Sequence, residues 1–187
     1  MPPDTRTRMI DAAVDALRQH GVAGMSFTDV LADSGGARGA IYHHFPGGKA
    51  QLVAEAAARN GAEVRDQLAA LPGGTPAEVV DAFLAAIRPV VAESTAGSGC
   101  AVAAVALGGT PDSEQIASTA FGSWISALAG RLTAVGLTPA DASDLAATLI
   151  TVLEGAHVLC RAAASLEPYE QAARTIAALV AARAAGG

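Results

Sequence analysis

The sequence contains few of the residues that characterise several large classes of protein. Aromatic residues make up only 4% of its 187 residues, and only two cysteines are present. Two thiols are too few for a disulfide framework, and the scarcity of aromatic side chains argues against a β-sandwich. The hydrophobic fraction is nevertheless 51%, and most of it is alanine, leucine and valine, which favour closely packed helices. We therefore expect an all-helical protein.

Long uninterrupted apolar runs are also missing. A membrane span needs about 18 or more apolar residues, and Asp, Glu, Arg or Gly interrupts every candidate segment. The N-terminal residues MPPDTRTRMIDAAV pass directly into an amphipathic pattern, without the apolar segment and cleavage site of a signal peptide. The sequence thus predicts a cytoplasmic protein with no membrane segment. Cys100 and Cys160 lie in apolar surroundings, where buried thiols are expected.

Positive charge is scarce, since 12 lysines and arginines stand against 18 acids and the formal net charge is −6. This balance argues at first against nucleic acid, because phosphate binding needs cations. The charges are unevenly distributed, however. No acid occurs in residues 34–54, and this window contains Arg38, His43, His44 and Lys49. A locally positive surface is therefore predicted on an acidic protein.

Apolar spacing and glycine positions predict helices from the start of the chain. The first helix extends from about Thr5 to His20, where Gly21 is placed to stop it. Ser26 can cap the N-terminus of a short second helix. Gly35-Gly36 then ends that helix after two to three turns.

A third short helix is indicated by Ile41 and Phe45, which lie four residues apart on one face. Pro46-Gly47-Gly48 ends it, and a fourth helix begins near Lys49. Two short helices joined by a glycine turn, with long helices on either side, form a helix-turn-helix. We accordingly divide the chain into a helix-turn-helix module at 1–48 and a larger helical body at 49–187.

A repeated helix-start signal marks the rest of the chain. Thr75-Pro76-Ala77-Glu78 supplies an N-cap, a proline at N1 and a capping-box acid, and Thr138-Pro139-Ala140-Asp141 has the same layout. Leu71-Pro72-Gly73-Gly74 is interpreted as a hinge before these helices. Pro89 should start or kink a segment, and Pro168 should divide the last two helices. The helices are expected near 76–95, 100–108, 113–135, 139–165 and 168–184.

The residues of the acid-free window are suited to contact with DNA. In a helix-turn-helix the second helix lies in the major groove, and neighbouring elements hold phosphates. Arg38 can reach a guanine edge or a phosphate, while Gly39 and Ala40 leave room for the groove to approach the backbone. Tyr42 and His43 can turn their polar tips outward. Phosphate contacts at helix N-termini are predicted for Lys49, Ser26 and Thr28.

The segment SFTDVLADSGGARGAIYHHFPGGKAQLV, at residues 26–53, resembles the DNA-binding module of the TetR family of bacterial transcriptional regulators. That module reads as a capped helix, a glycine turn and a Lys/Arg-Gly-x-Leu/Ile-Tyr-x-x-Phe recognition helix. The matching residues are Arg38, Gly39, Ile41, Tyr42, Phe45 and Lys49. Together with GCAVAAVAL at 99–107, the YHHFPGGK run is similar to the branch of lincomycin-resistance and flavonoid-responsive repressors. Gly36 stands where valine is frequent, and Ala37 where serine or threonine caps the recognition helix.

The resemblance implies an all-α homodimeric repressor that binds a palindromic operator in double-stranded DNA and is released by a small-molecule inducer. It makes residues 1–48 a helix-turn-helix DNA-binding domain and residues 49–187 a helical ligand-binding and dimerisation domain. The C-terminal helices, at about 139–184, carry a broad apolar face that is either core or the dimer interface. An apolar ligand pocket is predicted from six residues, each of which can equally be ordinary core. They are Phe83, Ile87, Phe121, Trp124, Leu128 and His157.

Other functions have weaker support. The adjacent His43 and His44 point about 100° apart and cannot readily share a metal ion. A di-iron site needs two Glu-x-x-His motifs, and only Glu154 with His157 is present. Cys100 and His157 lack an orienting third residue, so no enzymatic activity, metal or cofactor is predicted. The alternative is a helical small-molecule carrier or interaction protein that has lost DNA binding.

Overall fold

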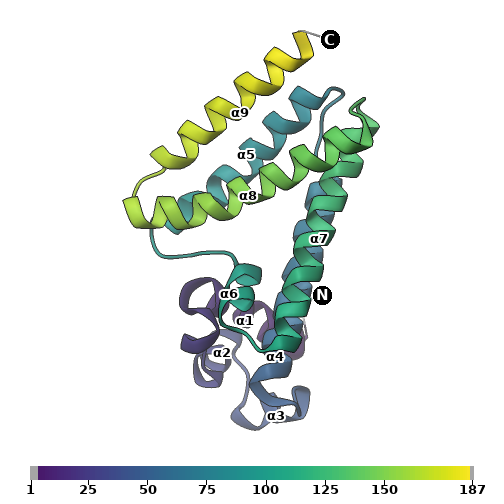
Figure 1. Cartoon of the computed structure of the whole chain (residues 1–187). Helices are drawn as coiled ribbons and strands as arrows, with labels where there is room; N and C mark the ends of the chain where they lie inside the picture. Colours follow the sequence, from purple (N-terminus) through teal and green to yellow (C-terminus); the bar gives the residue numbers. More distant parts are fainter. Residues whose placement is uncertain (1–3, 186–187) are drawn as a thin grey trace. The chain divides into compact units, whose positions relative to one another are not determined.

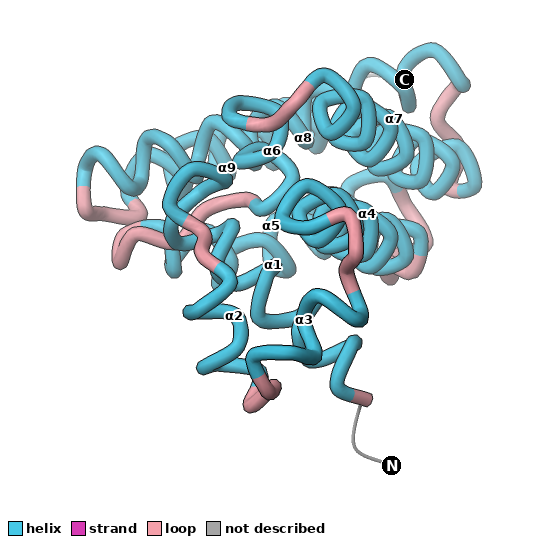
Figure 2. The backbone as a smooth tube through the Cα atoms, turned by 90° about the horizontal axis from the view of Figure 1, so that it is seen from below, coloured by secondary structure: helices cyan, strands magenta, loops and turns pink. Residues whose placement is uncertain are grey.

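The computed structural model describes residues 4–185, apart from the side chains of Arg38, Ala184 and Ala185. All regular secondary structure in this part of the chain is helical, as Figure 2 shows, which confirms the all-helical prediction. Nine helices span the described residues (Figure 1): α1 Thr5–Gly24, α2 Phe27–Ser34, α3 Arg38–His44, α4 Gly48–Ala69, α5 Pro76–Ser94, α6 Ala101–Gly108, α7 Pro111–Ala134, α8 Pro139–Ala163 and α9 Glu167–Ala185.

Local signals in the sequence set most helix boundaries. The Thr75 side chain accepts the backbone N–H of Glu78, and the Glu78 carboxylate accepts the Thr75 N–H, so the predicted capping box at the start of α5 is confirmed. At the start of α8 the Thr138 hydroxyl accepts the backbone N–H of Asp141 and donates to the Asp141 carboxylate at 2.7 Å. In α1, Gly21 has φ +66°, so helical geometry breaks at the glycine that was predicted to end the helix, although α1 as a whole extends to Gly24.

Pro89 lies inside α5. No helix starts there, because α5 continues through it from Pro76 to Ser94, so that half of the expectation is wrong; the alternative, a kink at Pro89, stays a prediction. Proline removes the hydrogen bond that the Ala85 carbonyl would otherwise accept. Both Pro89 and Ala85 lie on the exposed side of α5, where water can take the place of the missing donor.

Packing divides the chain into two compact units. The first comprises the residues up to Glu63 and Cys100–Phe121, and the second comprises Val64–Gly99 and the residues from Gly122 onward. The helices α4 and α7 therefore contribute to both units. The two units are defined by packing. The predicted boundary between residues 48 and 49 instead separates a DNA-binding domain from a ligand-binding and dimerisation domain, and it stays a prediction.

In the first unit, α1 packs against α2 and α6, and α3 packs against α2. The core is built from residues with almost no exposed surface: Met9, Ala13, Leu17, Val30, Ile41, Phe45, Leu52, Val102 and Val105. Cys100 is the N-cap residue of α6, and its sulfur accepts the Ala103 N–H. It is half-buried rather than buried as expected, because an N-cap lies at the end of its helix.

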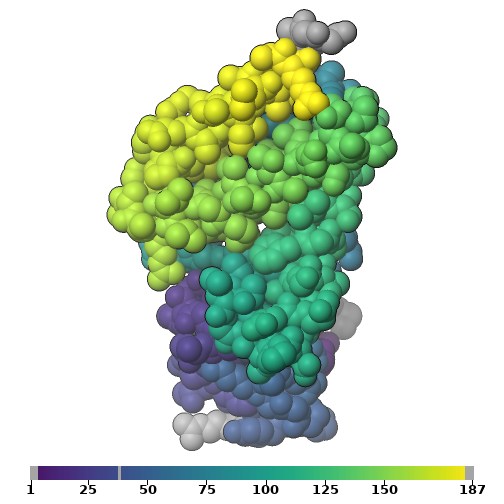
Figure 3. Space-filling model, in the orientation of Figure 1, coloured from purple at the N-terminus to yellow at the C-terminus, as the bar shows by residue number. Residues whose placement is uncertain are grey.

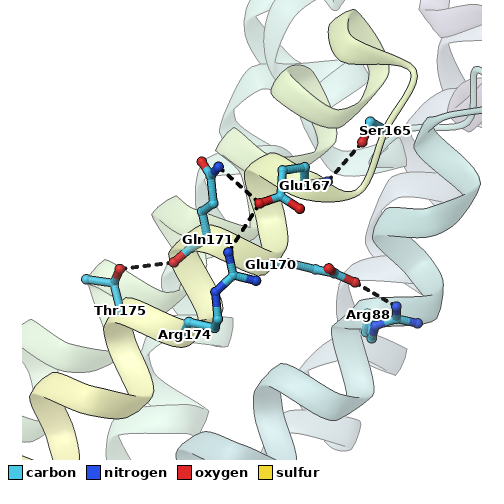
Figure 4. A network of polar contacts seen from close by, with 7 residues as sticks. All are labelled: Arg88, Ser165, Glu167, Glu170, Gln171, Arg174 and Thr175. Atoms are coloured by element: carbon cyan, nitrogen blue, oxygen red, sulfur yellow. Dashed lines mark hydrogen bonds and ion pairs between the residues drawn. The ribbon is translucent and has the colours of Figure 1, made fainter.

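In the second unit, α5, α8 and α9 pack against one another. The core includes Val79, Phe83, Trp124, Leu128, Leu132, Leu149 and Cys160. Arg88 of α5 and Glu170 of α9 form an ion pair at 2.7 Å, which Figure 4 marks with a dashed line. The Tyr169 hydroxyl donates to the Leu84 carbonyl, and burial raises the pKa of this tyrosine. These contacts fasten α9 to α5.

The helix α8 is the one described helix that is long and apolar enough to cross a membrane, judged by length and composition alone. Core helices of water-soluble proteins pass the same test. One side of α8 is buried within the chain, through residues such as Ala146, Leu149, Leu153 and Cys160. The other side stays exposed, so α8 has one face that packs in the core and one that has no cover in the single chain.

Candidate nucleic-acid interface

The turn between α2 and α3 depends on glycine. Gly35 has φ +66° and ψ 22°, a left-handed conformation that glycine adopts at little cost, and it ends α2. Gly36 follows, and its N–H donates to the Leu31 carbonyl at 3.2 Å. A Cβ at Gly36 would lie 2.4 Å from the Cε of Met9. A valine here would require the flexible end of the Met9 side chain to move.

The helix α3 has one buried side and one exposed side. Ile41 and Phe45 have no exposed surface, as their spacing predicted. Tyr42 is 66% exposed, and its ring meets that of Phe27 edge-on with centroids 5.8 Å apart. His43 is exposed as well. The buried stripe thus anchors α3 in the first unit, and Phe27 supports the outward-pointing Tyr42.

Gly39 lies in the first turn of α3 and is exposed. A Cβ added to it would meet no atom within 4 Å, so the packing of this chain does not require a glycine there. A small residue at such a position lets another molecule approach the helix closely. Ala40 is half-buried next to it. Arg38 begins α3, but its side chain lies outside the described part of the structure.

A chain of polar contacts fixes the start of α4. The Gly47 N–H donates to the Gln51 side-chain oxygen at 2.8 Å, and the Gln51 amide donates to Glu55 at 2.9 Å. Arg6 of α1 pairs with the same carboxylate, and its guanidinium lies 5.2 Å from the centroid of the Phe45 ring. The N-terminus of α4 is therefore held to both α1 and the end of α3.

Three residues were predicted to hold phosphates. Lys49 lies in the first turn of α4, is half-buried, and has no ion-pair partner among the described residues. Thr28 is exposed in the first turn of α2. Ser26 is the N-cap of α2: its hydroxyl accepts the Asp29 N–H and donates to the Asp29 carboxylate at 2.6 Å. A phosphate at Ser26 would have to replace this internal bond, whereas Lys49 is available.

Two family models match the chain. Residues 9–56 match the model described as bacterial regulatory proteins, tetR family, and residues 76–175 match the C-terminal domain of LmrA/YxaF-like transcriptional regulators. The chain belongs to the TetR family of bacterial transcriptional regulators. The second match confirms the predicted branch of the family, and the protein is a DNA-binding transcriptional regulator.

Relatives of this TetR-family regulator cover nearly its whole length. An uncharacterized HTH-type transcriptional regulator of Mycobacterium tuberculosis is 34% identical over 173 residues, which is 88% of each chain. LmrA of Bacillus subtilis is 26% identical and covers 88% of this chain and 90% of its own.

Solved structures of other regulators share the fold. A TetR regulator from Legionella pneumophila superposes with a TM-score of 0.80 at 20% identity, covering 96% of this chain and 98% of its own. The regulator CifR, solved as a cysteine mutant in complex with 26-bp operator DNA, has a TM-score of 0.66 at 27% identity, covering 93% and 97%.

The helix α3 of this TetR-family regulator lacks a side-chain cap at its N-terminus, as the sequence predicted. Ala37 occupies the N-cap position of α3 with φ −74° and ψ 144°, the extended conformation that a serine cap also adopts. Ala37→Ser is therefore expected to raise the free energy of unfolding by about 0.5–2 kcal/mol, because the hydroxyl can accept a free N–H of the first turn. Urea denaturation followed by circular dichroism measures the change.

The control for this substitution is Ala32→Ser, which adds the same hydroxyl to an exposed position inside α2. Serine has a lower helix propensity than alanine, so this variant should be neutral or slightly less stable. Equal effects of the two substitutions would show that no cap forms at Ala37.

The predicted ligand residues lie in two places. Phe83, Ile87, Trp124 and Leu128 are buried in the second unit, whereas Phe121 belongs to the first. His157 is also buried in the second unit, and its Nδ1 lies 2.7 Å from the hydroxyl of Ser94. The pocket itself stays a prediction, since these apolar side chains equally form the core of the unit.

Sequence reasoning missed two parts of these sites. Ser94 pairs with His157 across 63 positions, and no local pattern signals such a contact. The contacts of Gly47, Gln51 and Glu55 were detectable, because these residues are spaced four apart, from the residue just before α4 into its second turn. Arg6 completes that chain from 49 positions away.

Proposed function

We propose that this protein is a cytoplasmic repressor that binds a palindromic operator as a homodimer and leaves it when a small apolar or aromatic ligand binds the helical body. The DNA-binding part of this proposal is supported by the exposed face of α3. Tyr42, His43 and Gly39 lie on that face, while Ile41 and Phe45 anchor the opposite side in the core. A helix so divided can enter the major groove without losing its packing.

The start of α4 is suited to bind a DNA phosphate. The first N–H groups of a helix and its dipole favour an anion, and Lys49 adds a full positive charge at the same place. The contacts from Gly47 through Gln51 and Glu55 to Arg6 hold this terminus next to α3. One phosphate bound here would set the depth and register of α3 in the groove.

The dimer is assigned to α8 and α9. Large apolar side chains are exposed on both helices, with Val158 at 65%, Leu159 at 58% and Leu179 at 66%. Exposed apolar residues on neighbouring helices mark an interaction surface. The recognition helices of the two chains must lie about one helical turn of DNA apart to reach both half-sites of a palindrome. A two-fold symmetric dimer can place them at that spacing.

The ligand is assigned to the second unit, where Trp124 is surrounded by apolar core and the Ser94 and His157 pair supplies a polar anchor. Trp124 is the only tryptophan of the chain. Its fluorescence therefore reports on this part of the protein alone, and it provides the signal for an inducer screen.

The proposal is tested by fluorescence anisotropy with DNA from immediately upstream of the protein's own gene, at two salt concentrations and with excess nonspecific competitor. Binding that survives competitor and weakens with salt supports it. If this DNA and a genome-wide selection of binding sites both fail, the DNA-binding assignment is wrong and a small-molecule carrier becomes the better description.

Lys49→Ala gives a sharper result in the same assay. The slope of log affinity against log salt concentration should become less steep by about 0.9 for each phosphate that is no longer neutralised, so by about 1.8 for a dimer. Arg65→Ala removes an exposed cation of α4 that lies outside the helix-turn-helix and should leave the slope unchanged. Identical slopes for wild type and Lys49→Ala would show that Lys49 neutralises no phosphate.

A further inference from the structure

The chain has a single lysine, Lys49, among its 12 lysines and arginines. Lysine and arginine differ in what can be done to their charge. The lysine amine can lose its proton, act as a nucleophile and accept an acyl group, whereas the guanidinium of arginine stays protonated. Acylation removes the positive charge of a lysine. Among the side chains of this protein, Lys49 is therefore the one cation that an acyl donor can neutralise.

The surroundings of Lys49 leave its amine available for reaction. The residue lies in the first turn of α4, and its side chain is half-buried, so part of it reaches solvent. Among the residues that the structure describes, it has neither a hydrogen-bond nor an ion-pair partner. The first acid of α4, Glu55, is engaged by Arg6 and by the Gln51 amide. Figure 3 shows the segment that includes the end of α3 and the start of α4, in blue, at the lower surface of the view.

Most arginines, in contrast, have a role within the fold. Six of them form ion pairs: Arg6, Arg59, Arg65, Arg88, Arg174 and Arg183. Arg131 donates to the Leu71 carbonyl at 2.7 Å, and Arg8 donates to the Ser34 carbonyl at 3.1 Å. Loss of the charge at Lys49 breaks no such contact in the described part of the chain. The fold therefore tolerates neutralisation of Lys49, whereas a DNA phosphate bound to Lys49 does not.

The charge of the neighbourhood favours an anionic acyl donor. Residues 34–54 contain no acid, so an anion that approaches Lys49 meets no carboxylate from this segment. Acyl phosphates are activated acyl donors that carry negative charge on their phosphate group. The proposed function places a phosphate of DNA at the same residue. An acyl phosphate thus combines the charge suited to this surface with an acyl group that the amine can accept.

We propose that Lys49 is acylated by small acyl phosphates and that this modification releases the protein from its operator. The unprotonated amine nitrogen of Lys49 attacks the carbonyl carbon of the donor. A C–N bond forms, the C–O bond to the phosphate breaks, and inorganic phosphate leaves with the electron pair of that bond. The amine proton passes to water. The product is a neutral amide, which no longer neutralises a DNA phosphate.

The inference rests on the proposed function and adds a means of regulating the same site. Acylation in both chains of a dimer should make the slope of log affinity against log salt concentration less steep by about 1.8, the value expected for Lys49→Ala. Operator affinity should fall at least about tenfold, because two charge-assisted contacts to phosphate are lost.

The experiment treats the full-length protein with acetyl phosphate and compares operator affinity before and after treatment by fluorescence anisotropy. Mass spectrometry of the intact protein and of its peptides identifies the acetylated residue. Lys49→Arg keeps a cation but has no lysine amine, so treatment should not change its affinity. This variant retains the N-terminal amine and thus reveals any effect of acetylation there. Lys49→Gln has a neutral amide side chain and should bind DNA as weakly as treated wild type.

The control for reactivity is Arg65→Lys. Arg65 lies on α4 outside the helix-turn-helix, is exposed, and pairs with Asp66 at 2.7 Å. The introduced lysine therefore has an acid beside it, which repels an anionic donor. In this variant Lys49 should be acetylated several-fold faster than the introduced lysine, and added salt should reduce the difference because it screens charge. Circular dichroism should show native helix content for all treated proteins.

The outcomes separate this inference from the proposed function. Faster acetylation of Lys49 together with weaker operator binding of the wild type, and unchanged binding of Lys49→Arg, supports the inference. Lys49 that stays unmodified or reacts no faster than the introduced lysine overturns it, and so does acetylated protein that binds as tightly as before. In those cases untreated wild type still binds its operator, and the proposed function stands. Untreated wild type that binds no DNA sequence specifically overturns the proposed function and the inference together.

Discussion

Tyr42→Ala is expected to lower operator affinity about tenfold or more while leaving the unfolding transition of the protein unchanged. The side chain is 66% exposed, so its removal opens no cavity. A hydrogen bond from its hydroxyl to a DNA phosphate is of the charge-assisted kind, worth roughly 1.5–3 kcal/mol, and a dimer loses two of them. Anisotropy titration against operator DNA measures affinity, and thermal unfolding measures stability.

Two further variants show what Tyr42 contributes. Tyr42→Phe keeps the ring against Phe27, whose centroid is 5.8 Å away, and removes only the hydroxyl. If it binds as weakly as Tyr42→Ala, the hydroxyl makes the contact; if it binds as wild type, the ring does. Leu107→Ala trims a strongly exposed side chain outside the helix-turn-helix and should change neither property. Wild-type affinity in Tyr42→Ala would remove this residue from the interface.

Phe45→Ala, three residues further along the chain, should have the opposite profile. Phe45 has no exposed surface, and truncation of a buried phenylalanine costs about 3–5 kcal/mol through reduced burial and the cavity that remains. The ring also supports the Arg6 guanidinium 5.2 Å from its centroid. Chemical denaturation should show the loss of stability directly, and operator binding should weaken because α3 is no longer anchored.

A conservative variant identifies the cause. Phe45→Leu retains most of the apolar volume and should cost clearly less than Phe45→Ala. Equal destabilisation by both would point to the ring contact with Arg6, whereas no destabilisation by either would contradict the placement of Phe45 in the core. Measured together, Tyr42 and Phe45 test whether the two sides of α3 have separate roles.

Much of the fold was predictable because it depends on short-range rules. The spacing of Ile41 and Phe45 predicted the buried side of α3, and Thr75 with Glu78 predicted a capping box that the structure contains. The expected helix start at Pro89 was wrong, because whether a helix can continue through a proline depends on which side of it faces water, and local sequence does not state that.

The nucleic-acid interface likewise has some parts that local sequence predicted and others that it did not. The charge pattern and the family motif pointed to α3 and the start of α4, since these residues are neighbours in the sequence. The Arg6 contact that steadies α4 joins residues 49 positions apart, and the His157 contact with Ser94 joins residues 63 apart. Neither contact can be recognised from a repeated spacing in the sequence, because the segment between the two residues can have any length.

The sequence by itself determined the helical class, most helix ends and the family of this regulator, because capping, periodicity and the recognition-helix motif each act within a few residues. Only the tertiary structure decided which side of α8 is buried, that Arg6 engages the Glu55 carboxylate, and that Lys49 has no ion-pair partner among the described residues. Those properties arise where distant helices meet, and the packing of side chains between helices sets them.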